Sequence, residues 1–174
     1  MVKSIINILE KIFITLSMSF PYTNILVVCS VNTARSPMTV GFLKDYFKKN
    51  KMNVEVTSGG IASNARDGML ISQDAKLVMN EVDINLPNDS VSIDLKKRPE
   101  LIKKADLILT LTEDHKKEVL RYITLNHIKV ITLREFAGES GDIEDPSMKG
   151  FDGFRKTRNE IKYCIEKGLK RFEW

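Results

Sequence analysis

Short apolar runs alternate with amphipathic stretches along most of this chain. Runs rich in aliphatic and β-branched residues predict four buried strands, at 24–28, 54–57, 106–111 and 128–132. Elsewhere apolar residues recur every three to four positions, which predicts helices at 74–82, 99–105, 112–123 and 151–172. A further helix is predicted to open at Ser36-Pro37, with Ser36 as its N-cap and Pro37 in its first turn. Strands that alternate with helices predict an α/β fold, a three-layer sandwich around a central four-stranded parallel sheet.

The ends of the predicted strands mark where function is expected. The first strand ends at Cys29, and parallel sheets bind ligands at the carboxyl ends of their strands. Ser58-Gly59-Gly60 is expected to stop the second strand, because neighbouring glycines favour turns. Residues 137–150 combine glycines with acidic residues and predict a loop.

The chain has 174 residues, enough for one domain with a sizeable core. We expect this domain to span 24–174, behind a helical N-terminal extension at 1–23. Glu10 and Lys11 interrupt the apolar run of the extension, and Pro21-Tyr22-Thr23 does not resemble a signal-peptide cleavage site. The extension is interpreted either as a helix packing on the domain or a partner, or as residues ahead of a natural start at Met18.

Composition narrows the class of protein. Lys and Arg number 27 against 23 Asp and Glu, a net charge of +4 that would attract an anionic substrate. The basic residues form no long run beside an aromatic ladder, so nucleic-acid binding is not expected. Cys29 and Cys164 lie far apart without a Cys/His cluster, which disfavours a structural zinc site. A catalytic thiolate at Cys29 would suit a reducing compartment, so we expect a cytoplasmic protein.

The segment from Cys29 to Arg35 predicts a phosphate-binding loop. A cysteine and an arginine frame small or polar residues that lead into a helix, namely Ser30, Val31, Asn32, Thr33, Ala34 and then Ser36. Such a loop turns successive backbone N–H groups inward, and the helix N-terminus adds free donors and a positive dipole end. The planar guanidinium of Arg35 can hold two phosphate oxygens together.

The same donors favour the thiolate of Cys29, with the Ser36 hydroxyl as a hydrogen-bond donor to it. A thiolate ringed by oxyanion donors can attack phosphorus and form a phosphocysteine. Asp145, held before Pro146, is the best candidate acid for the leaving group; its rivals are Asp142, Glu144 and Asp152. The alternative interpretation is that Cys29 is a buried apolar cysteine and the acidic loop is merely solvated.

These residues resemble a known family. Cys29 to Pro37 is similar to Cys-x-Gly-Asn-x-x-Arg-Ser-Pro, the active-site loop of the low-molecular-weight protein tyrosine phosphatases. The similarity continues at Thr57-Ser58-Gly59-Gly60, at 105–116 and at Asp145-Pro146, and it covers almost all of 24–174. It implies the flavodoxin- or Rossmann-like architecture of that family.

By this resemblance Cys29 is the nucleophile, Arg35 binds phosphate and stabilises the transition state, and Asp145 is general acid and then base. Asn32 would support the loop through a hydrogen bond to Ser58. The implied reaction is hydrolysis of phosphotyrosine-type phosphomonoesters, without a metal or other cofactor. The implied partners are a phosphorylated protein or peptide and inorganic phosphate or another oxyanion, with no nucleic acid and no stable membrane insertion.

The chain departs from the family pattern at three places. Val31 replaces the usual Gly, which would strain the loop if that position required positive φ. Ala34 replaces a frequent second cysteine, so a protective disulfide within the loop is not expected. Ser147-Met148 stand where tyrosine-specific members often carry aromatic residues, which leaves a thin wall for a phosphotyrosine ring unless Met148 or Phe151 substitutes.

Thr33 favours an alternative substrate. Tyrosine-specific members often carry a bulky aliphatic residue there, whereas the bacterial protein-arginine phosphatases resemble this chain in Thr33, in 132–136 and in 138–146. Protein-arginine phosphatase is therefore the alternative function. An arsenate reductase would need relay cysteines, and none lies between 30 and 163. A phospho-binding module without turnover would be expected to lack Cys29, Arg35 or Asp145.

Overall fold

The computed structural model describes residues 20–124 and 127–172. Its centre is a four-stranded sheet in the order β2-β1-β3-β4. The strands are β1 (Asn24–Cys29), β2 (Glu55–Gly60), β3 (Leu107–Thr110) and β4 (Lys129–Thr132). All three neighbouring pairs are parallel, and Ile25 of β1 aligns with Val56 on one side and Leu107 on the other. The predicted parallel sheet is confirmed.

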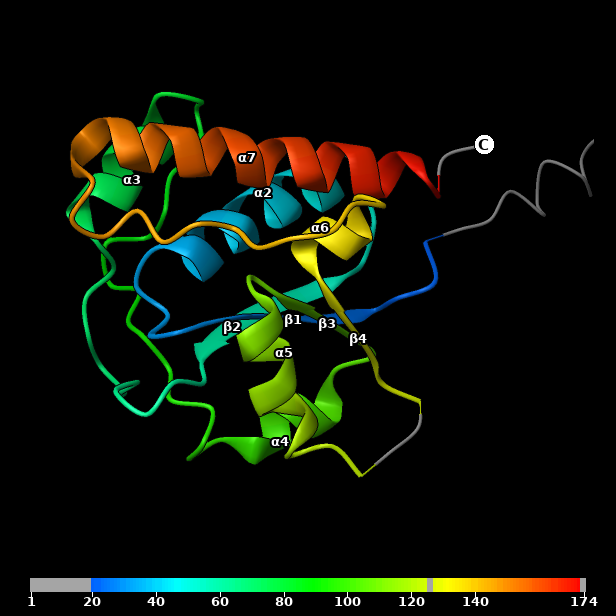
Figure 1. Cartoon of the computed structure of the whole chain (residues 1–174). Coiled ribbons are helices and arrows are strands. Elements are labelled where there is room, and N and C mark those ends of the chain that lie inside the picture. Colours follow the sequence, from blue (N-terminus) through cyan, green and yellow to red (C-terminus); the bar gives the residue numbers. More distant parts are fainter. Residues whose placement is uncertain (1–19, 125–126, 173–174) are drawn as a thin grey trace, which may run out of the picture.

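Helices cover both faces of the sheet (Figure 1). One face carries α2 (Arg35–Lys49), α3 (Gln73–Asn80), α6 (Leu133–Phe136) and α7 (Gly150–Lys170). The other face carries α4 (Pro99–Lys104) and α5 (Glu113–Leu120). Side chains alternate along β1, so Ile25 and Val27 enter the core beneath α2 and α7, while Leu26 and Val28 enter the core beside α4 and α5.

The strand order creates a crevice at one edge of the sheet. β1 and β3 are neighbours, and their carboxyl ends lie at the same edge. The chain leaves β1 into α2 on one face, and it leaves β3 into α5 on the other face (Figure 1). Where successive connections diverge in this way, a parallel sheet opens a ligand-binding crevice.

Two local predictions were wrong. β2 does not stop at Ser58 but continues to Gly60, which aligns with Cys29 of β1 and also forms a bridge with Asp94. α2 begins at Arg35 with Ala34 as its N-cap, rather than at Ser36, because the Ser36 hydroxyl bonds to the Cys29 side chain instead. The short helix α6 was not predicted.

The N-terminal helix predicted for 1–23 falls mostly on residues 1–19, outside the described residues. From residue 20 the chain packs on the domain, since the Phe20 ring lies 5.2 Å from the rings of both Phe47 and Phe172. The domain boundary at residue 24 stays a prediction. Within the described ranges, no helix combines the length and apolarity needed to cross a membrane.

Candidate active site

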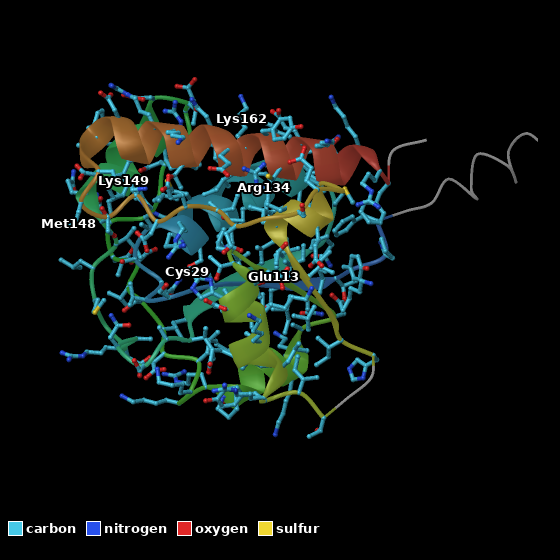
Figure 2. All side chains as sticks on the ribbon, in the orientation of Figure 1. Cys29, Glu113, Arg134, Met148, Lys149 and Lys162 are labelled. Atoms are coloured by element: carbon cyan, nitrogen blue, oxygen red, sulfur yellow. The ribbon has the colours of Figure 1, made fainter. Side chains whose placement is uncertain are left out.

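The crevice between the ends of β1 and β3 contains the predicted phosphate-binding loop. Cys29 is the last residue of β1 and Arg35 is the first of α2, so the loop joins the strand to the helix. Figure 2 shows Cys29 in the interior, near the first turn of α2. Cys29, Asn32 and Arg35 are all buried. These three side chains are therefore shielded, whereas Ser30, Val31, Thr33 and Ala34 of the same loop are partly exposed.

Two donors are directed at the sulfur of Cys29. The backbone N–H of Asn32 donates to Sγ at 3.2 Å, and Ser36 Oγ lies 2.9 Å from it. Ser36 Oγ already accepts a hydrogen bond from Asn32 Nδ2 at 2.9 Å, so its own proton is free to point at the sulfur. A sulfur that accepts two such bonds is well suited to carry negative charge. The donor role expected of Ser36 agrees with this geometry.

Asn32 holds the loop in its tight shape. Its φ of 61° is in the left-handed region, which asparagine tolerates better than most residues. Its Nδ2 donates to Ser58 Oγ at 2.8 Å, the contact that the resemblance implied, and its Oδ1 accepts from the N–H of Ile93 at 2.9 Å. Positive φ thus falls on Asn32 and not on Val31. The strain considered for Val31 does not arise.

Gly60 lets β2 pass directly beneath the loop. A methyl group at Gly60 would lie 2.8 Å from the Ser30 carbonyl oxygen and 2.9 Å from Val31 Cα. Both neighbours are backbone atoms, which cannot rotate away. The glycine that was expected to end a strand is thus needed for a close approach.

Arg35 connects the loop to the acidic segment more than a hundred residues away. Its Nη1 donates to the Ile143 carbonyl at 3.0 Å, and its Nη2 donates to Ser30 Oγ at 3.0 Å and to Asp145 Oδ2 at 2.5 Å. The N–H of Ile143 donates to the carbonyl of Leu111 at 2.8 Å, which ties the same segment to the end of β3. The structure therefore brings Cys29, Arg35 and Asp145 to one place.

Asp145 is the acidic residue that reaches Arg35. Burial opposes ionisation of Asp145, but hydrogen bonds from Ser147 and the positive charge of Arg35 outweigh it and hold the pKa below the usual range. The three rival acids are occupied elsewhere: Asp142 accepts from the N–H of Glu113 at the start of α5, Glu144 pairs with Lys149, and Asp152 pairs with Arg155. Geometry thus separates four acids that residue chemistry left open.

His115 is a site residue that sequence reasoning missed. It lies in the first turn of α5, where its N–H donates to the capping Thr112 hydroxyl at 3.1 Å. Its buried ring places Nε2 2.9 Å from Ser30 Oγ. Burial, together with the charge of Arg35, lowers the pKa of His115 to about 4, so the imidazole is neutral at pH 7. The sequence signal that could have found His115 was its place just after the third predicted strand. Because β1 and β3 are neighbours, the helix that follows β3 begins beside the loop that follows β1.

The side chains expected to form the substrate wall are open or engaged elsewhere. Met148 is fully exposed on the segment before α7 (Figure 2), and Phe151 has the Arg155 guanidinium 4.3 Å from its ring centroid. Thr33 is half-buried, and its carbonyl accepts from the N–H of Ser72 at 2.8 Å. No hydrogen bond within the described residues uses the Thr33 hydroxyl.

The second cysteine is buried in α7, away from this loop in the sequence. Both cysteines are unpaired, and burial raises the pKa of Cys164 to about 11. A thiol with so high a pKa is a poor relay nucleophile. Within residues 20–124 and 127–172, no three His, Cys, Asp or Glu side chains are grouped as a metal site.

Residues 24–173 match the family described as low molecular weight phosphotyrosine protein phosphatase. A protein-arginine-phosphatase from Geobacillus stearothermophilus is 35% identical over 154 residues, covering 88% of this chain and 97% of the relative. The tyrosine phosphatase PtpB of Staphylococcus haemolyticus is 34% identical over 140 residues, which cover 80% of this chain and 93% of the relative. A solved structure of the YwlE arginine phosphatase aligns with a TM-score of 0.77 at 31% identity, covering 86% of this chain and 95% of the solved chain. That solved protein is a cysteine-to-serine mutant with a phosphorylated active-site serine.

A buried cysteine ringed by donors, with an arginine and a carboxylate at the crevice of a parallel sheet, defines a cysteine-dependent phosphatase. The family match extends over most of the chain, and the solved relative has the same fold. The chain belongs to the low molecular weight phosphotyrosine protein phosphatase family. It is a hydrolase of phosphorylated proteins, and the predicted family is confirmed.

Proposed function

We propose that this chain hydrolyses phosphoryl groups on protein side chains through a phosphocysteine at Cys29, with phosphotyrosine as the first candidate substrate. The observation that carries the proposal is the convergence at one loop of two donors on Cys29 Sγ with the Arg35–Asp145 contact. Family membership supports the reaction class. The residue roles follow from the chemistry of the cluster.

In the first step the Cys29 thiolate attacks phosphorus and forms the S–P bond. The bond from phosphorus to the tyrosine oxygen breaks, and its electron pair goes to that oxygen. Asp145, in its protonated form, gives its proton to the leaving oxygen. The phosphoryl oxygens bind Arg35, whose guanidinium then has a competing anion, and the Arg35–Asp145 contact weakens. Loss of that contact favours the protonated form of Asp145 that the step requires.

In the second step water attacks phosphorus and the S–P bond breaks. Asp145, now a carboxylate, takes a proton from the water, and Cys29 leaves as the thiolate. Inorganic phosphate is the product, and the loop that binds the substrate phosphoryl group also binds this oxyanion. Backbone N–H groups between 30 and 35 and at the start of α2 are expected to supply the donors.

The nucleophile is tested by turnover of p-nitrophenyl phosphate without added metal. Cys29→Ser should lose activity by at least about 10³-fold, because serine at this position is a much weaker nucleophile. Cys164→Ser is the matched control, since Cys164 is buried in α7 and outside the loop. Activity that survives in Cys29→Ser would eliminate the mechanism, whereas Cys164→Ser should keep the wild-type rate.

The acid is tested by Asp145→Asn, which keeps the shape of the side chain and removes its proton chemistry. The variant should lower kcat about 10²- to 10⁴-fold, the usual contribution of general acid catalysis. Glu144→Gln is the control, because the adjacent Glu144 carboxylate pairs with Lys149 rather than with Arg35. An equal loss in both variants would count against Asp145 as the acid.

Phosphoarginine is a second candidate substrate, favoured by two observations. The Thr33 side chain sits in the loop with its hydroxyl unused by the hydrogen bonds of the described residues, so it is available to a polar leaving group. Met148 is exposed and Phe151 faces Arg155, which leaves little aromatic surface to hold a phenol ring. Two relatives are named protein-arginine-phosphatases, which supports the same candidate.

Substrate class is tested with phosphotyrosine and phosphoarginine peptides of the same sequence. Thr33→Val removes the hydroxyl at nearly constant volume, and Thr33→Ile adds bulk. If the hydroxyl recognises the guanidine, both variants should shift the kcat/KM ratio about tenfold towards phosphotyrosine. If shape alone matters, only Thr33→Ile should shift it. An unchanged ratio in both variants would refute the role of Thr33.

We also propose a reducing, cytoplasmic setting. Cys29 must stay a free thiolate to react, and both cysteines are unpaired. Ala34 leaves the loop without a second cysteine that could protect Cys29 by a disulfide. Peroxide should therefore inactivate Cys29 without recovery by an intramolecular disulfide, which mass spectrometry of the oxidised protein would reveal.

A further inference from the structure

The hydroxyl of Ser30 lies between two site residues from different elements. Arg35 Nη2 is 3.0 Å from Ser30 Oγ, and His115 Nε2 is 2.9 Å from the same oxygen. A guanidinium carries only donors, so Ser30 Oγ must accept the bond from Arg35. A hydroxyl has two lone pairs and one proton. The protonation of His115 Nε2 therefore determines whether Ser30 uses its remaining lone pair or its proton in the bond to the ring.

The neutral ring of His115 has two tautomers, with opposite consequences for Ser30. If Nε2 carries the proton, it donates to Ser30 Oγ, both lone pairs are occupied, and the Ser30 proton is free. If Nδ1 carries the proton, Ser30 donates to the bare Nε2 and keeps an unused lone pair. The first arrangement offers a donor to a phosphoryl oxygen, and the second turns a repelling lone pair towards it.

The surroundings of Nδ1 favour the first tautomer. His115 Nδ1 is buried and has no hydrogen-bond partner among the described residues. A proton on Nδ1 would be a buried donor without an acceptor, and orphaned buried N–H groups are rarer than unsatisfied acceptors. A bare Nδ1 avoids that donor and leaves the proton on Nε2, where Ser30 Oγ accepts it.

We propose that His115 is a positioning residue that makes Ser30 an additional donor to a phosphoryl oxygen held by Arg35. Ser30, Arg35 and His115 line one open hollow of about 610 Å³, so an anion bound to the guanidinium there would lie beside the Ser30 hydroxyl. The inference rests on the proposed function, in which Arg35 binds the phosphoryl group. It adds one donor from a loop side chain to the backbone donors of the loop.

The tautomer of His115 is measured by a long-range proton–nitrogen correlation spectrum of the uniformly ¹⁵N-labelled chain. Only two histidines are present, His115 and His127, so His127→Gln assigns both rings. We expect the His115 ring to carry its proton on Nε2 and none on Nδ1. A proton on Nδ1 would overturn the proposal, whatever the activity of the protein.

The added donor is measured by titrating the protein with inorganic phosphate. Ser30→Ala should weaken phosphate binding about tenfold, the usual effect of losing a hydrogen bond to a charged group, and Ser30→Thr should restore it. His115→Leu should weaken binding to a similar degree, whereas His115→Gln, which keeps a donor near the Nε2 position, should recover most of it. Ser63→Ala is the matched control, because Ser63 is exposed and lines the same hollow.

The outcomes separate this inference from the proposed function. Phosphate binding that depends on Ser30 and His115, in a chain without phosphatase turnover, would refute the function and keep the inference. Normal turnover with phosphate binding unchanged in Ser30→Ala would refute the inference and keep the function. Failure of the wild-type chain to bind phosphate would refute both.

Discussion

Replacing Gly60 with alanine would add one methyl group directly beneath the phosphate-binding loop. The added carbon would lie 2.8 Å from the Ser30 oxygen and 2.9 Å from Val31 Cα, whereas ordinary contact begins at 3.4 Å. Because both neighbours are backbone atoms, the loop or β2 must move by about half an ångström. Either movement alters the relation between the loop and the strand below it.

The size of the effect follows from that displacement. Overpacking a tight site costs about 1–3 kcal/mol, and removing a glycine from the unfolded chain returns about 0.4–1 kcal/mol. We therefore expect Gly60→Ala to lower the free energy of unfolding by about 1–2 kcal/mol. Misplacing catalytic groups by about 1 Å can cost about 10²-fold in rate, so half that shift should lower kcat about tenfold.

Gly59→Ala separates stability from catalysis. A methyl group at Gly59 would meet the Leu95 side chain at 2.4–3.0 Å, and its three nearest atoms all belong to Leu95. Leu95 is fully buried, so this variant should also be destabilised. It should keep the wild-type kcat because the loop is not touched.

The assay combines urea unfolding with kcat for p-nitrophenyl phosphate, measured at a temperature where both variants are folded. The reasoning predicts two destabilised variants, of which only Gly60→Ala is slow. Wild-type kcat in Gly60→Ala would refute the claim that the loop rests on this glycine. An equal loss of kcat in Gly59→Ala would refute the separation of the two faces of β2.

The remaining predictions concern Asn32 and His115. Asn32→Ala should lower the free energy of unfolding, measured in urea, by about 2–4 kcal/mol, because the Ile93 N–H loses its acceptor and alanine must adopt a φ of 61°. Asn32→Gly should recover about 1 kcal/mol of that loss, because glycine adopts positive φ without strain. Equal losses in the two variants would argue against backbone strain at this position. The pKa of His115 is lowered from 6.5 to about 4 in the folded chain, so the unfolded chain takes up the proton at a higher pH than the folded chain. The free energy of unfolding should therefore fall as the pH drops from 6.5 to 4, by up to about 3 kcal/mol. His115→Gln should show a flatter dependence over that range in urea titrations at several pH values, and an identical slope would contradict the buried neutral ring.

Among the described residues, the pattern of apolar runs predicted the four strands, five of the six helices and the fold class, but not the short helix α6. Strands at 24–28 and 106–111 and the helix after Thr112 could be predicted because a buried strand and a capped amphipathic helix leave local signals in the sequence. Local signals misled where a contact with the phosphate-binding loop took over. Gly60 continues β2 because its missing side chain makes room for the loop, and Ser36 bonds to Cys29 instead of capping α2.

Some residues of the candidate site could likewise be recognised from the sequence, and others only from the structure. Cys29 and Arg35 could be recognised because they frame one continuous loop, and their chemistry depends on near neighbours in the chain. Asp145 was the best candidate among four acids from its place before Pro146 and from the family resemblance. The packed structure adds that its carboxylate reaches Arg35 across 110 positions. His115 gave no sequence signal strong enough to be chosen, because a single histidine in a helix is common.

The sequence by itself thus determined the alternation of strands and helices, the loop at the end of the first strand and the reaction class that this loop supports. These features depend on interactions between residues that are close together in the chain. Only the tertiary structure decided that Asn32 bears the left-handed turn, that Gly60 supports the loop and that His115 reaches Ser30. Those relations join different strands and helices, and their geometry depends on how the sheet edge brings the ends of β1, β2 and β3 together.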